Sequence, residues 1–256
     1  MASAKPRKPP RRRAWRAIRE APPGLLIAAA AVALLLAWLV VNLAVQVARK
    51  PTELFYPVSG VLNKLPVETW RSYEPIFRAH ATDTVTPDFL AALAQVEGAG
   101  NPFARPPWRW RLTEDPFGVY RPASSAVGMY QITDGTFRQA RRYCIRDREV
   151  VEDGPWHEWS SCWFNWLYFR VVPSHAAEMT SAFLDLNVTR VLRLQRRRDA
   201  SLRQRQDLAA VMHLCGVSAG EAYARSGFRA LPSCGGQNVS AYLGQVGAMQ
   251  RLFSRL

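Results

Sequence analysis

The feature that most constrains this chain is a stretch of 28 residues, from 21 to 48, without a charged side chain. Its central part, residues 25–47, is apolar except for Asn42 and Gln46 near the C-terminal end. About 20 apolar residues are enough to cross the hydrocarbon core of a bilayer. A cleavable signal peptide has a shorter apolar region, of about 7–15 residues, followed by a small-residue cleavage site. We therefore predict an uncleaved transmembrane helix at residues 21–48.

The charge distribution predicts the orientation of this helix. The chain has 256 residues and a formal net charge of +14, and eight of its 34 basic residues lie within residues 1–20. A basic cluster beside a span stays on the cytoplasmic side of the membrane, so residues 1–20 are predicted to be a cytoplasmic tail. We expect a single-pass protein of a bacterial inner membrane, with its large domain in the periplasm. Because membrane topology accounts for the basic tail, no nucleic-acid partner is expected.

The four cysteines all follow the predicted span, at positions 144, 162, 215 and 234. None of them forms a C-x-x-C pair, which a zinc site would usually contain. Cysteines of exported domains generally form disulfides. Four cysteines allow three pairings, and we predict the pairing of nearest neighbours, Cys144–Cys162 and Cys215–Cys234.

The rest of the chain divides into a linker and one mainly helical domain. Residues 49–65 are punctuated by Pro and Gly and lack periodicity, which is typical of a linker. From residue 66 onward the pattern is mostly helical. Trp70, Tyr73 and Phe77 have helical spacing, although Pro75 predicts a break or a kink. Residues 101–124 contain five prolines and predict a long loop.

One helix has clear boundaries and an unusual last turn. Thr86 suits an N-cap, Pro87 suits the first helical position, and Gly98 and Gly100 predict the end. Glu97 falls on the apolar face of this helix in its last turn. Desolvation and the negative end of the helix both oppose a charge there. A carboxyl group that keeps its proton is what a general acid needs, although a helix-terminal Glu turned toward water is the simpler alternative.

Three motifs share the spacing of one enzyme family. They are Glu97-x-x-x-Asn101-Pro102, Ser125-x-x-Gly128-Met129-Tyr130-Gln131-Ile132-x-x-x-Thr136 and Asn238-x-x-x-Tyr242-Leu243-x-x-Val246. Together they resemble the catalytic region of the soluble lytic transglycosylase (SLT) family, over residues 66–256 and most closely over 86–140. The resemblance implies a lysozyme-like, mainly α (α+β) domain that follows the single transmembrane helix.

The resemblance also implies an activity. The enzyme would cut the β-1,4 bond between N-acetylmuramic acid and N-acetylglucosamine in peptidoglycan and form a 1,6-anhydro ring. Glu97 would act as general acid and then as base, without a cofactor, and the sequence contains no metal or nucleotide motif. The residues implied to bind substrate are Met129, Tyr130, Gln131, His213 and Tyr242. The expected partners are peptidoglycan glycan strands, the membrane, and cell-envelope or secretion-apparatus proteins.

The chain departs from the family pattern at the site itself. Gly98 stands where the family has a serine, and His213 and Leu214 stand where it has a tyrosine and an asparagine. Two alternatives therefore stay open. One is a weak or inactive cell-wall-binding or assembly protein. The other is a hydrolytic muramidase that uses a second carboxylate such as Glu114 or Asp115.

Residues 176–212 are predicted to be mostly helical and are rich in arginine. An arginine face could attract an anionic cell wall or lipid head groups. It could equally be a solvated face, and we favour this second interpretation.

Overall fold

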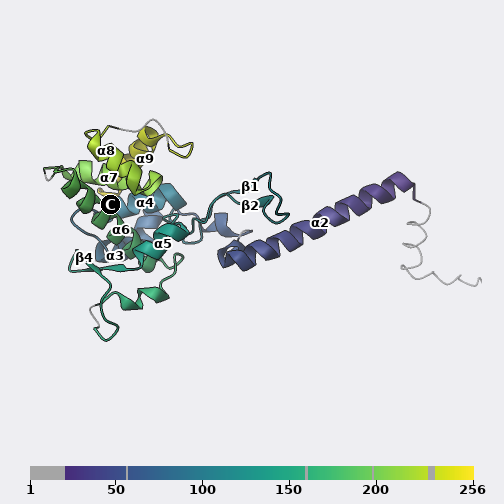
Figure 1. The fold of residues 1–256 in the computed structure, drawn as a ribbon, viewed down its shortest axis with the longest axis horizontal. Helices are drawn as coiled ribbons and strands as arrows, with labels where there is room; N and C mark the ends of the chain where they lie inside the picture. The colour runs from purple at the N-terminus through teal and green to yellow at the C-terminus, as the bar shows by residue number, and fades with distance from the viewer. Residues whose placement is uncertain (1–20, 56, 159–160, 198, 230–233) are drawn as a thin grey trace, which may run out of the picture. The chain divides into compact units, whose positions relative to one another are not determined.

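The structure, a computed structural model, describes residues 21–55, 57–158, 161–197, 199–229 and 234–256 (Figure 1). The predicted basic tail at residues 1–20 lies outside the described residues. The chain separates into two compact units. One joins the N-terminal helix to residues 111–120, and the other comprises residues 54–110 and 121–256.

The N-terminal helix, α2 (Pro23–Arg49), is long and apolar enough to cross a membrane, as the sequence predicts. Its two polar side chains, Asn42 and Gln46, are buried. Asn42 Nδ2 donates to the backbone carbonyl of Tyr120 at 2.8 Å, and Gln46 Nε2 donates to that of Phe117 at 2.6 Å. Buried amides are costly unless they find partners. The two polar interruptions of the apolar stretch therefore hold the 111–120 loop against the C-terminal part of α2.

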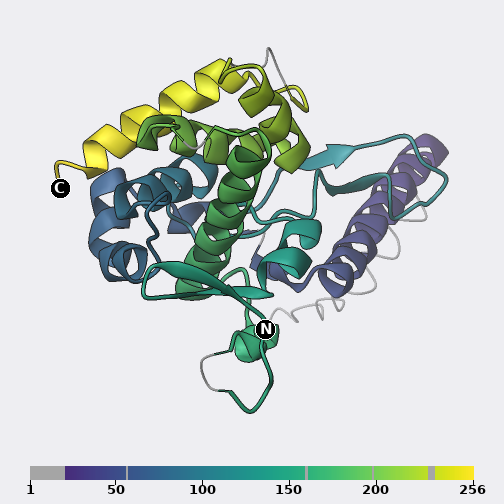
Figure 2. The same cartoon turned by 60° about the vertical axis from the view of Figure 1, so that its left-hand side comes forward.

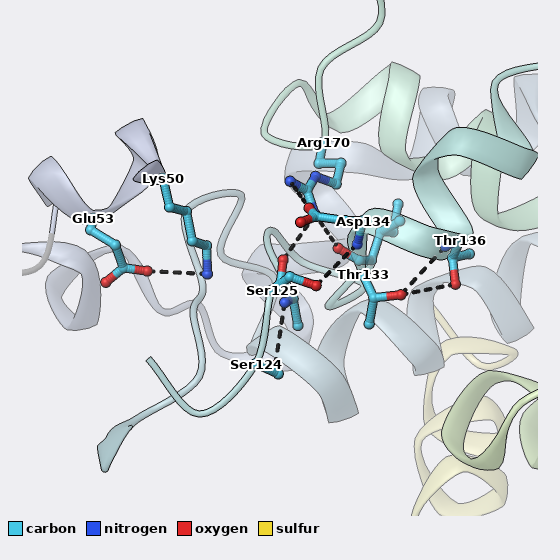
Figure 3. A network of polar contacts seen from close by, with 10 residues as sticks. Lys50, Glu53, Ser124, Ser125, Thr133, Asp134, Thr136 and Arg170 are labelled. Carbon is cyan, nitrogen blue, oxygen red and sulfur yellow. Dashed lines mark hydrogen bonds and ion pairs between the residues drawn. The ribbon is translucent and has the colours of Figure 1, made fainter. Parts of the chain in front are cut away.

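The segment predicted as a linker, residues 49–65, contains short helical turns. These are the 3-10 helices η1 (Pro51–Phe55) and η2 (Ser59–Leu62). Lys50 Nζ lies 3.1 Å from Glu53 Oε1, and the Glu53 side chain is fully buried (Figure 3). This ion pair fixes the backbone just after α2.

The second unit confirms the predicted mainly helical class. Its helices are α3 (Pro66–Ala79), α4 (Pro87–Gly98), α5 (Asp134–Ala140), α6 (Pro173–Leu194), α7 (Leu202–Cys215), α8 (Val217–Arg225) and α9 (Val239–Phe253), with the 3-10 helix η3 at Trp163–Leu167. Two short sheets accompany them, β1 (Trp108–Trp110) with β2 (Tyr120–Pro122) and β3 (Tyr143–Arg146) with β4 (Glu149–Glu152). The stretch at 101–124 is thus not all loop, because β1 and β2 pair within it.

Helix α3 continues through Pro75, so the helix does not break there, and the alternative of a kink stays a prediction. Proline removes one backbone hydrogen bond within a helix. Trp70 and Phe77, on either side of Pro75 in the sequence, are both buried in the core. Their burial holds the two turns together across the lost hydrogen bond.

The core of this unit forms where α4 meets its neighbours. Residues 89–94 of α4 are all buried. Helix α9 (yellow) lies along α4 and α7, and the long helix α6 (green) contacts α3, α5 and α7 (Figure 2). Helix α4 is thereby enclosed, and its C-terminal end lies close to the side chains of α7 and α9.

Both predicted disulfides form. Cys144 of β3 is bonded to Cys162, just before η3, and Cys215 at the end of α7 is bonded to Cys234 before α9. The Cα–Cα distances are 5.5 and 5.7 Å. The second bond therefore joins the end of α7 to the segment that precedes α9.

Candidate active site

Helix α4 positions the candidate acid because both of its ends are fixed. At its N-terminus, Gln206 Nε2 of α7 donates to the carbonyl of Thr84 and to Thr86 Oγ1, at 3.2 and 3.0 Å. Thr86 occupies the predicted N-cap position, but its hydroxyl accepts from Gln206 rather than from its own helix. At the other end Ala99 adopts a left-handed conformation and ends the helix after Gly98. Both predicted ends of this helix are confirmed.

Glu97 lies in the last turn of α4 and is largely enclosed, with a side-chain exposure of 16%. Its Oε1 accepts a hydrogen bond from Tyr242 Oη of α9 at 2.5 Å. The same oxygen lies 3.7 Å from His213 Nε2 of α7. The structure therefore brings together three of the predicted site residues from three different helices.

The two oxygens of this carboxylate have different surroundings. Oε1 faces both Tyr242 and His213. Within the described part of the chain, Oε2 has no hydrogen-bond partner. One oxygen is thus anchored by the protein, and the other is available to a ligand.

Tyr242 is suited to be a permanent donor to this carboxylate. Its side chain is buried, and burial, the charge of Glu97 and the hydrogen bond to Glu97 all raise its pKa well above the usual value. A tyrosine in this state keeps its proton at any ordinary pH. The hydrogen bond therefore runs from Tyr242 to Glu97 and fixes the orientation of the carboxylate.

The Gly-Met-Tyr-Gln motif forms a tight turn against the end of α4. Val127 and Ile132 pair as an isolated antiparallel bridge, which closes the turn. Gly128 has a φ of +83°, and a Cβ there would lie 2.3 Å from the carbonyl oxygen of Arg170. A Cβ on Gly98 would lie 2.8 Å from Met129 Cα. The turn and the helix are therefore in backbone contact, and a side chain at position 98 has no room.

The structure places the three motif residues of this turn differently. Met129 is 1% exposed and Tyr130 is 0% exposed, so both side chains belong to the core. Gln131 is half-buried, has a φ of +46°, and donates from Nε2 to the carbonyl of Gly128 at 2.9 Å. Sugar contacts by these residues stay a prediction. In this structure Gln131 offers the more accessible side chain, and the other two shape the turn.

Arg170 holds the same segment from its other side. Its Nη1 donates to the carbonyls of Ser125 and Ile132 at 2.9 and 2.8 Å, and its Nη2 lies 2.8 Å from Asp134 Oδ1. Figure 3 shows this guanidinium beside Asp134 and Ser125, at the start of α5. Sequence reasoning missed Arg170, because a single arginine far from a motif carries no local signal.

Asn101 of the first motif has a structural role. Its buried Nδ2 donates to Ser59 O and to Asn63 Oδ1, at 2.5 and 2.9 Å. Its Oδ1 accepts from the backbone N–H of Phe103 at 2.8 Å. Asn101 therefore ties η2 to the loop that follows Glu97.

Asp115, one of the two acids considered for a hydrolase, makes its contacts with Arg49 and with its own loop. Asp115 Oδ2 lies 3.4 Å from Arg49 Nη1 of α2, and its Oδ1 accepts from the N–H of Phe117. Over the described ranges, no three His, Cys, Asp or Glu side chains gather in a way that could hold a metal ion.

Comparison with known proteins identifies no relative: no protein-family model matches the chain, and no curated protein or solved structure matches it significantly.

Proposed function

We propose that this chain is a membrane-anchored peptidoglycan lytic transglycosylase of the SLT family. The observation that carries the proposal is the pair of unlike oxygens on Glu97. Tyr242 binds Oε1 at 2.5 Å, and no described residue binds Oε2. The family motifs support the substrate class, and the contact of their turn with Gly98 supports a common site.

The proposed reaction needs one carboxyl group. Protonated Glu97 gives its proton from Oε2 to the glycosidic oxygen between muramic acid and glucosamine, and the bond from that oxygen to C1 breaks through an oxocarbenium-like transition state. The resulting carboxylate takes the proton of the muramic acid C6 hydroxyl. The C6 oxygen then bonds to C1 and closes the 1,6-anhydro ring without the use of water.

Two neighbours would support this cycle. Tyr242 donates to Oε1 throughout, so the carboxylate does not rotate between the two proton transfers. His213, at 3.7 Å, stabilises the negative carboxylate when its imidazole is protonated. It would take the supporting role of the tyrosine in the family pattern.

A binding or assembly role is the second candidate, and Leu214 favours it. Leu214 is half-buried, packs against the core and offers no amide to a sugar. A site with Glu97 but without that amide could hold a glycan strand without cutting it.

We propose that the helical domain lies in the periplasm. The apolar helix α2 and the eight basic residues before it give this orientation by the positive-inside rule. Two disulfides fit an oxidising compartment. A reporter fused after Leu256 should be active only if it functions outside the cytoplasm.

The activity is tested with Glu97→Gln in the full-length chain, with Glu149→Gln as the control at an exposed acid. Parent and control should release muropeptides that end in 1,6-anhydromuramic acid, and Glu97→Gln should bind glycan but release almost none. Reducing muramic ends would establish a hydrolase. If the parent releases no products and Glu97→Gln behaves like it in a cell-wall pull-down, the binding role is correct.

A further inference from the structure

A hollow of about 670 Å³ lies between α5 and α6, and arginine dominates it. Its lining includes Arg138, Arg142, Phe183, Leu186, Arg190 and Arg193, and contains no acidic residue. We call it the arginine groove. Arg190 and Arg193 are three residues apart on α6 and so share one face of that helix. Arg138 lies on α5, and Arg142 follows that helix.

The charge in the arginine groove is only partly compensated. Arg142 is paired, with Nη2 at 2.9 Å from Glu152 Oε1 and Nε at 3.5 Å from Asp153 Oδ2. Arg138, Arg190 and Arg193 make no ion pair with any residue that the structure describes. Like charges gathered in one hollow repel one another, and a bound anion would offset that repulsion.

The kind of anion follows from the lining. Guanidinium groups are planar and bind carboxylates through two parallel hydrogen bonds. A ligand with more than one negative group is needed to neutralise the charge of three unpaired guanidinium groups. Phe183 and Leu186 give the groove an apolar part that a peptide chain can cover. A short peptide with several free carboxylates meets all of these conditions.

The arginine groove also adjoins the candidate site. Phe183 lines both the groove and a small internal cavity, and that cavity is also lined by Thr136 and His213. His213 in turn lies 3.7 Å from Glu97. Thr136 belongs to the second motif, and its neighbour Gly135 lines the groove. The groove and the candidate site are thus linked through Phe183 and through the start of α5.

We propose that the arginine groove binds the carboxylate-bearing peptide stems of the glycan strand, so that the protein selects strands that still carry peptides. This inference rests on the proposed peptidoglycan substrate. A concave site that shares Phe183 with the cavity at His213 fits a stem better than a flat lipid surface.

The test measures binding of two soluble glycan preparations to the full-length chain in neutral-lipid nanodiscs. One preparation carries peptide stems, and the other has been stripped of them by an amidase. Binding is measured in the Glu97→Gln background, which prevents cleavage. We expect tighter binding of stem-bearing strands, and Arg190→Ala with Arg193→Ala should weaken that binding about tenfold or more, as expected for lost charge-assisted hydrogen bonds. Arg251→Ala with Arg255→Ala removes the same charge from an exposed part of α9 and its end, and should change nothing.

The outcomes separate this inference from the proposed activity. If the groove variant binds both preparations as its parent does, the inference about the groove is wrong. This holds even if the protein with Glu97 intact cuts glycan, which would support the proposed activity. If stem-bearing strands are preferred and the groove variant abolishes the preference, the inference stands even where no anhydro product forms. A soluble short-chain phosphatidylglycerol serves as the lipid probe. If the groove variant loses this lipid and keeps its preference for stems, the groove binds lipid and the inference fails.

Discussion

Gly98, the residue directly after the candidate acid, should not tolerate a side chain. A Cβ there would lie 2.8 Å from Met129 Cα, 2.9 Å from Met129 O and 3.1 Å from Ala104 Cβ. Carbon atoms in good contact are about 3.5 Å apart, so α4 and the turn at 128–131 would have to separate by about 0.7 Å. Two of the three atoms belong to backbone, so rotation of a side chain cannot relieve the clash.

We therefore expect Gly98→Ala to destabilise the protein by about 1–3 kcal/mol, the usual cost of overpacking. For a domain of this size that corresponds to a fall in Tm of roughly 2–4 °C for each kcal/mol. Gly98→Ser, which introduces the serine of the SLT pattern, should behave in the same way. The readout is thermal unfolding of the detergent-solubilised full-length chain, followed by tryptophan fluorescence.

Gly244 gives the matched control. It lies exposed within α9, and a Cβ there would meet nothing within 4 Å. Gly244→Ala should leave the protein unchanged or stabilise it by about 0.5–1 kcal/mol, because alanine favours a helix over glycine. If Gly98→Ala unfolds at the same temperature as Gly244→Ala, the backbone contact does not restrict position 98, and our account of the glycine at this position is wrong.

Three further predictions concern other parts of the helical unit. Tyr242→Phe should keep the fold and lower the rate of glycan cleavage about tenfold or more, with little change in KM. The reason is that a hydrogen bond to a charged group contributes about 1.5–3 kcal/mol. An unchanged rate would show that this bond does not orient the carboxylate. Replacing Cys144 and Cys162 by serine should lower the free energy of unfolding in urea by about 3 kcal/mol, the value expected for a loop of this length. Free thiols at these positions in a peptide map of the non-reduced parent protein would contradict the disulfide. Burial lowers the pKa of His80 below its ordinary 6.5 despite the nearby charge of Glu178. Because the unfolded chain therefore takes up the proton at a higher pH than the folded chain, the free energy of unfolding should decrease as the pH falls below 6.5. His80→Gln should make this decrease measurably smaller in urea titrations.

The features that the sequence predicts well are those with local causes. The long apolar helix expected at 21–48 is recognised from composition alone, and α2 covers Pro23–Arg49. The ends of α4 are recognised from a proline at the start and glycines at the end. The disulfide pairing follows from nearest neighbours in the chain. None of these predictions requires knowledge of where distant segments meet.

Predictions that rest on local signals fail where tertiary packing opposes them. Pro75 argues for a break, yet α3 continues because Trp70 and Phe77 anchor it in the core. The prolines of residues 101–124 argue for a loop, yet β1 and β2 pair there. In both cases a regular element forms where the prolines argue against one.

The motif residues show a second limit of sequence reasoning. Met129, Tyr130 and Gln131 are consecutive, and a family resemblance assigns all three to the sugar subsites. In the structure the first two are buried in the core, and a positive φ at Gln131 turns the chain at that point. A sequence motif shows which residues occur together, but it does not distinguish residues that stabilise a turn from residues that contact a ligand.

The arrangement around Glu97 depends on contacts that no spacing rule supplies. Tyr242 reaches it from 145 positions further along the chain. His213 stands at the same carboxylate oxygen from a third helix, and the Cys215–Cys234 bond joins the end of that helix to the segment before α9. Because the two neighbours share one oxygen, our proposal that Oε2 meets the substrate rests on the fold and not on the motif. If the proposed activity holds, Tyr242 alone can orient Oε1 although His213 stands where the SLT pattern has a tyrosine, and Tyr242→Phe tests this more directly than any change at His213.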